Sequence, residues 1–145
     1  MKDASYSLRV AYMEALSGLQ HDGKEIFAYD EVAPDNDTVY IVISGQSFSE
    51  SSLKCGFSTD HMISLNIICK YPIGSGVTKK VSEEIANLVL GRVYPSTGAT
   101  SVSIVSDFNI WNSRLVGNRS IIDETGREKV ITKVLTFQHS INQIS

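Results

Sequence analysis

The stretch His61-Met-Ile-Ser-Leu-Asn-Ile-Ile-Cys-Lys-Tyr71 has the cleanest alternation of apolar and polar side chains in the sequence. One set of alternate positions holds Ile63, Leu65, Ile67, Cys69 and Tyr71, and the other set holds Ser64, Asn66 and Lys70, with Ile68 as the exception. Successive side chains of a strand point to opposite faces of a sheet. The stretch therefore predicts a central strand with one buried face and one wetter face.

The length and composition are those of one globular domain. A chain of 145 residues with 42% hydrophobic and 20% charged residues is expected to bury about 70% of the surface that its unfolded form exposes. No apolar run reaches the roughly 20 residues of a membrane span, and acidic and polar residues occupy the N-terminus where a signal peptide has an apolar block. We expect one domain over residues 1–145, made and used without secretion and without a membrane.

The net charge of −3 is unevenly distributed along the chain. Residues 1–60 contain ten acids against four bases, whereas residues 61–145 contain six acids against nine bases. An acidic chain lacks the basic surface that general binding to nucleic acid requires. The most acidic piece, residues 22–37, is interpreted either as a solvated loop or as one half of an electrostatically complementary contact between subunits.

Two amphipathic segments predict helices. Between Asp3 and Leu19 the apolar residues recur at steps of three and four, and Gly18 lies where a left-handed residue commonly ends a helix. Thr78 is placed to cap a second helix. The apolar face expected for this second helix consists of Val81, Ile85, Leu88 and Val89. That face is expected to pack on the apolar side of the sheet.

Further strands are expected on both sides of the central one. Residues 38–44 are β-branched or aromatic almost throughout, which is typical of a strand buried on both faces. Residues 101–112 alternate in polarity with a bend near Asp107, and Trp111 is interpreted as a packing residue. Residues 114–123 and 128–141 flank a glycine-containing turn and predict a hairpin.

These elements predict an α+β fold. We expect a mostly antiparallel sheet of about four to five strands, two helices packed on one of its faces, and a long β-hairpin arm. The arm would comprise residues 45–60, a serine-rich segment that is long for a hairpin loop. Either the two flanking strands extend past the body of the domain, or a mobile loop carries Phe48, Leu53 and Phe57 toward a partner. We interpret this segment as an assembly element that becomes ordered on binding.

No motif in the sequence predicts catalysis or ligand binding. Cys55 with His61 lacks an orienting group and an oxyanion feature, so no catalytic residue is assigned. Asp35 and Asp37 lack the further oxygen ligands of a calcium loop, and the three histidines are scattered, so no metal and no cofactor is expected. Cys55 and Cys69 sit in different contexts and are expected to be reduced thiols.

The order of elements resembles the tail-completion or tail-terminator family of tailed bacteriophages along nearly the whole chain. The residues that carry the resemblance are the proline-acid turn at 34–38, Tyr40-Ile41-Val42-Ile43-Ser44-Gly45, His61 at the start of the next strand, Lys80-Val81-Ser82-Glu83-Glu84-Ile85-Ala86, and Leu135-Thr136-Phe137. Members of this family are small α+β domains that assemble into a ring, usually hexameric, at the head-proximal end of the tail. The ring stops growth of the tail tube and joins the tail to the head.

The resemblance implies a structural virion protein of the phage neck, assembled in the host cytoplasm, and not an enzyme. Its implied partners are further copies of itself, the tail tube protein and head-tail connector or stopper proteins, with DNA passing through the channel without specific binding. Candidate interface residues are Phe48, Leu53, Phe57, Arg114 and Arg119. The alternative is a small soluble binding or accessory enzyme domain with a cleft beside the sheet.

Overall fold

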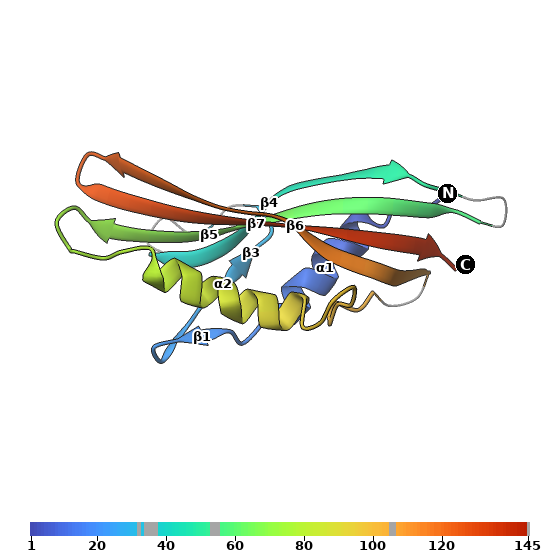
Figure 1. Cartoon of the computed structure of the whole chain (residues 1–145), viewed down its shortest axis with the longest axis horizontal. Helices are drawn as coiled ribbons and strands as arrows, with labels where there is room; N and C mark the ends of the chain where they lie inside the picture. Colours follow the sequence, from blue (N-terminus) through green and yellow to red (C-terminus); the bar gives the residue numbers. More distant parts are fainter. Residues whose placement is uncertain (32, 34–37, 53–55, 105–106, 145) are drawn as a thin grey trace.

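A computed structural model describes residues 1–31, 33, 38–52, 56–104 and 107–144, with the Thr125 side chain left out. The elements in chain order are α1 (Ser5–Ala15), β1 (Gln20–His21), β2 (Lys24–Glu25), β3 (Ala28–Tyr29), β4 (Val39–Glu50), β5 (Ser58–Pro72), α2 (Lys80–Val93), β6 (Phe108–Thr125) and β7 (Glu128–Gln143). A long twisted sheet lies on a shorter layer of helices (Figure 1). The predicted α+β class is confirmed. The expected turn at 34–37, Leu53 and Cys55 lie outside the described residues.

The main sheet of the described chain has the strand order β3-β4-β5-β7-β6. β3 runs parallel to β4 over two residue pairs, and the other neighbours are antiparallel. The predicted terminal hairpin is confirmed as β6 and β7, which pair from Phe108↔Gln143 to Thr125↔Glu128. Its two-residue turn begins at Gly126, whose φ of +59° suits the glycine position of a type II′ turn.

β5 is the central strand that its alternation predicts, because β4 pairs with one side of it and β7 with the other. Ile63, Leu65, Ile67 and Cys69 are completely buried, whereas Ser64 and Asn66 on the opposite face are half-buried. We call the buried side the inner face of the sheet and the opposite side the open face. Burial raises the pKa of the free Cys69 thiol to about 11.

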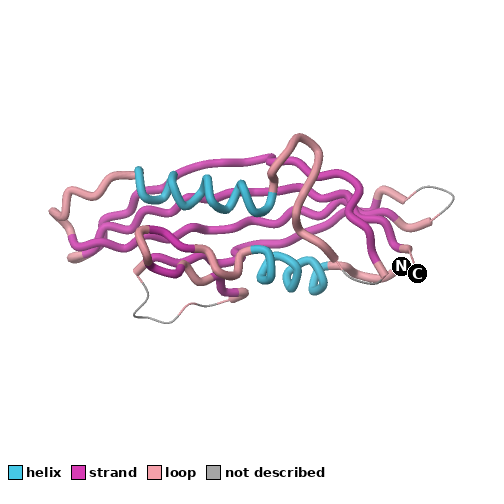
Figure 2. The backbone as a smooth tube through the Cα atoms, turned by 90° about the horizontal axis from the view of Figure 1, so that it is seen from below, coloured by secondary structure: helices cyan, strands magenta, loops and turns pink. Residues whose placement is uncertain are grey.

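Both long helices cover the inner face, as predicted (Figure 2). The Thr78 hydroxyl accepts a hydrogen bond of 3.3 Å from the backbone N–H of Lys80, the first residue of α2, although the N-cap position is Lys79 and not Thr78 as expected. The buried stripe of α2 consists of Ser82, Ile85, Ala86, Val89 and Val93. The expectation that Leu88 belongs to it is wrong, because small residues at 82 and 86 let the helix lie close to the sheet and leave Leu88 exposed at its flank.

Two strand boundaries differ from the expected ones. The strand expected over residues 101–112 begins at Phe108, and the described residues before it form a loop held by a hydrogen bond from the Ser113 backbone N–H to the Gly98 carbonyl. β4 continues past residue 44 to Glu50 and pairs with β5 throughout. The extended-strand alternative for residues 45–60 is therefore confirmed for the paired part, and the expectation of order only on binding is wrong there.

Candidate interaction surface

Neither of the described helices lies over the open face of the sheet (Figures 1 and 2). Residues paired across antiparallel strands share a face, so the register fixes which side chains lie here. A row of small residues crosses four strands of this face through the pairs Gly45↔Ser64, Ser64↔Thr136 and Gly117↔Thr136. The Ser64 and Thr136 hydroxyls are hydrogen-bonded to each other at 3.0 Å. The row forms the floor of a central groove.

A β-bulge interrupts both β4 and β6 beside this row. The register of β4 shifts between Ile43 and Gly45, and that of β6 shifts between Leu115 and Gly117. Bulges increase local twist and bend the strand that carries them. The central groove has a volume of about 760 Å³, and the side chains of Arg119 and Ile121 form part of its wall.

A second hollow of about 730 Å³ lies on the open face at the arm end of β5, β6 and β7. Phe57, Trp111 and Ile144 line it, and their side chains are 43%, 57% and 62% exposed. Arg114 lies beside them, with its guanidinium donating hydrogen bonds of 2.9 and 2.7 Å to the Gln138 side chain. We call this the arm-end hollow. Aromatic residues and arginine are enriched at protein interfaces and among their energetic hot spots.

The interpretation of Trp111 as a packing residue is wrong. The register of β6 shifts between Ile110 and Asn112, so Trp111 has no residue directly opposite on β7. The sequence did contain a signal for this. Phe108 and Ile110 occupy even positions and face the core, which places the odd-numbered Trp111 out of phase with them.

The structure brings some of the candidate interface residues together and separates others. Phe57 and Arg114 meet in the arm-end hollow, and Arg119 lies farther along the same face in the central groove. Phe48 is on the inner face instead, where its ring stacks on His61 with 4.9 Å between centroids. Leu53 lies outside the described residues. Sequence reasoning missed Trp111 and Ile144 as members of this surface.

A buried polar cluster beneath α1 has a superficial likeness to a nucleophile and its base. The Ser113 hydroxyl is 2.6 Å from His139 Nδ1, and His139 Nε2 is hydrogen-bonded to the Tyr12 hydroxyl. All three side chains are buried, and burial lowers the pKa of His139 to about 4. A nucleophile must reach its substrate, which this serine cannot do. The cluster joins α1 to β6 and β7 within the core.

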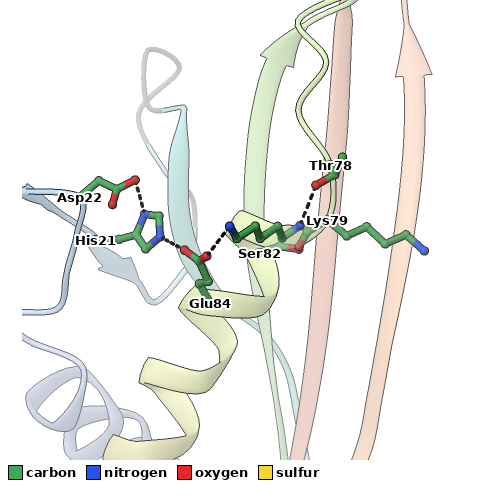
Figure 3. Close-up of polar contacts among 7 residues, drawn as sticks. His21, Asp22, Thr78, Lys79, Ser82 and Glu84 are labelled. Carbon is green, nitrogen blue, oxygen red and sulfur yellow. Dashed lines mark hydrogen bonds and ion pairs between the residues drawn. The ribbon is translucent and has the colours of Figure 1, made fainter.

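A second polar cluster joins the β1–β2 hairpin to α2 (Figure 3). His21 Nε2 is 2.6 Å from a carboxylate oxygen of Glu84, and His21 Nδ1 is 3.7 Å from Asp22. The hydrogen bond from His21 is the largest cause of a lowered pKa for Glu84.

Within the described residues there is no group of acidic, histidine and cysteine side chains that could hold a metal ion. No described helix is long and apolar enough to cross a membrane.

Comparison with known proteins reveals a structural likeness. No family model matches the sequence, and no curated protein matches it. Among solved structures, a chain from the virion of a native gene transfer agent particle matches with a TM-score of 0.73 at 15% sequence identity. The match covers 98% of this chain and 99% of that chain. The two chains therefore share one fold from end to end.

Proposed function

We propose that this protein is a structural component of a phage-like virion. The observation that carries the proposal is the likeness to a chain of a gene transfer agent virion. The structural alignment covers both chains almost completely, so the likeness is not confined to a common substructure. The exposed aromatic residues of the arm-end hollow support an assembling role, since large exposed apolar patches mark interaction sites. In this proposal the protein acts in the particle as a building block and not as an enzyme.

The finer proposal places the protein at the neck of the particle. The resemblance of its element order to tail terminators supports a ring, usually hexameric, that ends the tail tube and joins the tail to the head. Its partners would be further copies of itself, the tail tube protein, and connector or stopper proteins. The net charge of −3 suits a channel through which DNA passes without being held, because binding to phosphates requires a basic surface.

The test is a nonsense mutation in the gene, made in the virus or element that encodes it. We expect filled heads and unattached tails of irregular length in electron micrographs, and normal particles when the wild-type protein is supplied in trans. Attached tails of normal length without the protein would refute the neck assignment.

A matched pair of variants then tests the proposed surface. Trp111→Ser with Arg114→Glu should fail to restore particles, because both changes alter the arm-end hollow. Leu88→Ser removes an exposed apolar side chain from α2, away from the hollow, and should restore them. If both variants restore particles, the hollow has no role in assembly, and the alternative of a small binding domain with a cleft beside the sheet gains support.

A further inference from the structure

Among the described residues, β4 and β6 each have a stretch of edge with no backbone partner. On β4, β3 pairs with Ile41 and Val42, but no described backbone group bonds to the outer side of residues 46–50. On β6, the loop at Gly98 bonds to Ser113, but no described backbone group bonds to the outer side of residues 118–122. Each free stretch begins just after the bulge in its strand, at Gly45 or Gly117. Free edges of this kind pair readily with other strands.

The two free edges lie at opposite corners of the sheet. Residues 118–122 of β6 lie near the β6–β7 turn, and residues 46–50 of β4 lie on the arm at the other end (Figure 1). The helix layer is shorter than the sheet and leaves both ends uncovered. Each free edge accordingly has one large apolar side chain exposed on the inner face, Phe48 at 38% and Ile122 at 45%.

We propose that residues 46–50 of one copy pair, antiparallel, with residues 118–122 of the next copy. This inference deepens the proposed ring and rests on it. Along the sheet, β4 and β6 run in opposite directions, so two copies placed side by side with the same face outward meet as antiparallel strands. Phe48 and Ile122 then come to the same face, and Ser47 joins Ile121 on the open face. The two partner strands carry no like charges on either face, since Glu50 lies on the inner face and Arg119 on the open face.

The offset between the free edges provides an independent geometric check. The positions of the two edges can be compared along β5, which lies between them. The middle of the β6 edge, Ser120, is level with Ile67, because both pair with Lys133 of β7. The middle of the β4 edge, Phe48, pairs with His61, so the two edges are offset by six residues. At about 3.3 Å per residue the offset is roughly 20 Å, and four strands at about 4.8 Å span roughly 19 Å. Successive copies would therefore tilt their strands by roughly 45° from the ring axis, close to the tilt of about 35–45° in closed β-barrels.

The same offset keeps other elements out of the contact. β3 pairs with Ile41 and Val42 of β4, outside the edge used for the contact. The loop at Gly98 likewise bonds to Ser113 of β6, outside the second edge. The contact uses different surfaces on its two partners, and such head-to-tail contacts close into rings when the rotation between copies allows it.

Cysteine cross-linking of the full chain tests the pairing. Ser47→Cys and Ile121→Cys are combined in a Cys55→Ser background, with the buried Cys69 retained. The two positions lie on opposite edge strands of one subunit, so oxidation can join them only between copies. We expect a reducible ladder that ends at the size of the ring. The control combines Ser47→Cys with Leu88→Cys on α2, an exposed position away from the contact, and should give no ladder.

The outcomes separate the pairing from the ring. Mass photometry that shows oligomers, together with no ladder from the Ser47 and Ile121 pair, would overturn the edge pairing and leave the ring standing. A protein that stays monomeric at high concentration and gives no ladder would overturn both. As a second measurement, Ile122→Lys should abolish the oligomer without changing the melting temperature, whereas Leu88→Lys should leave it intact. Normal oligomers from Ile122→Lys would also overturn the pairing.

Discussion

The buried histidine of the polar cluster makes folding stability depend on pH in a predictable direction. His139 lies between Tyr12 and Ser113, and burial, its largest perturbation, holds its pKa at about 4 against an ordinary value of 6.5. Between these values the unfolded chain binds a proton that the folded protein does not. The contribution of the neutral, buried His139 to the free energy of unfolding is therefore fully present above pH 6.5 and is lost as the pH falls toward 4. The difference in pKa corresponds to about 3 kcal/mol.

The neighbouring histidine acts in the same direction. His61 pairs with His139 across β5 and β7, and burial lowers its pKa too, although the charges of Asp3 and Asp60 oppose the shift. The stability that the wild-type protein loses on acidification therefore contains a contribution from His139 and one from His61. His139→Asn removes one titrating group and keeps a donor and an acceptor, at a cost to stability that does not depend on pH. The difference between wild type and variant isolates His139.

The assay is urea unfolding of both proteins across this pH range. We expect the wild type to lose about 3 kcal/mol more than His139→Asn between pH 6.5 and 4. Parallel loss of stability in the two proteins would show that the imidazole titrates normally, and the argument from burial would be refuted.

Further predictions concern the register, a turn and the open face. Leu65→Ala should lower the free energy of unfolding by about 2–5 kcal/mol and Asn66→Ala by less than about 1 kcal/mol in urea melts, and equal losses would mean that the inner face is wrongly assigned. Gly126→Ala should cost about 1 kcal/mol because φ is +59°, whereas Gly91→Ala within α2 has open space and should stabilise by up to about 1 kcal/mol. Calorimetry that ranks these two variants in reverse would contradict the turn geometry. Trp111→Ser should leave the melting temperature within a few degrees of wild type, and a large drop would show that the indole packs in the monomer after all.

Much of the architecture could be predicted because its signals are local. The alternation around Leu65 identifies the central strand, and the turn at Gly126 identifies the terminal hairpin. The errors arose where tertiary contacts decide. Leu88 has the right spacing for the helix stripe, but the small side chain of Ala86 determines which side of α2 approaches the sheet. Trp111 is a different case, because its position out of phase with Phe108 and Ile110 already indicates in the sequence that it does not face the core.

The interaction surface was predictable only in part. Phe57 was a candidate because it is an apolar residue among serines, and Arg114 was a candidate interface residue on a different predicted strand. That they meet in one hollow depends on the pairing of β5 with β7 and of β7 with β6, which joins residues far apart in the sequence. Phe48 was assigned to an unstructured segment because serines surround it. The pairing of β4 with β5 overrides that composition and stacks Phe48 on His61.

The place of β7 in the sheet has a consequence for the synthesis of the protein. The last strand of the sheet in sequence order lies between β5 and β6, and it supplies His139 to Tyr12 at a separation of 127 residues. Until β7 is complete, β6 has no partner and α1 has only part of the surface on which it packs. Nascent chains should therefore stay unfolded until β7 has been synthesised and then reach the native state in one late step, slowly for a chain of this length. A premature stop before residue 128 would leave no folded remnant that could compete with the intact protein.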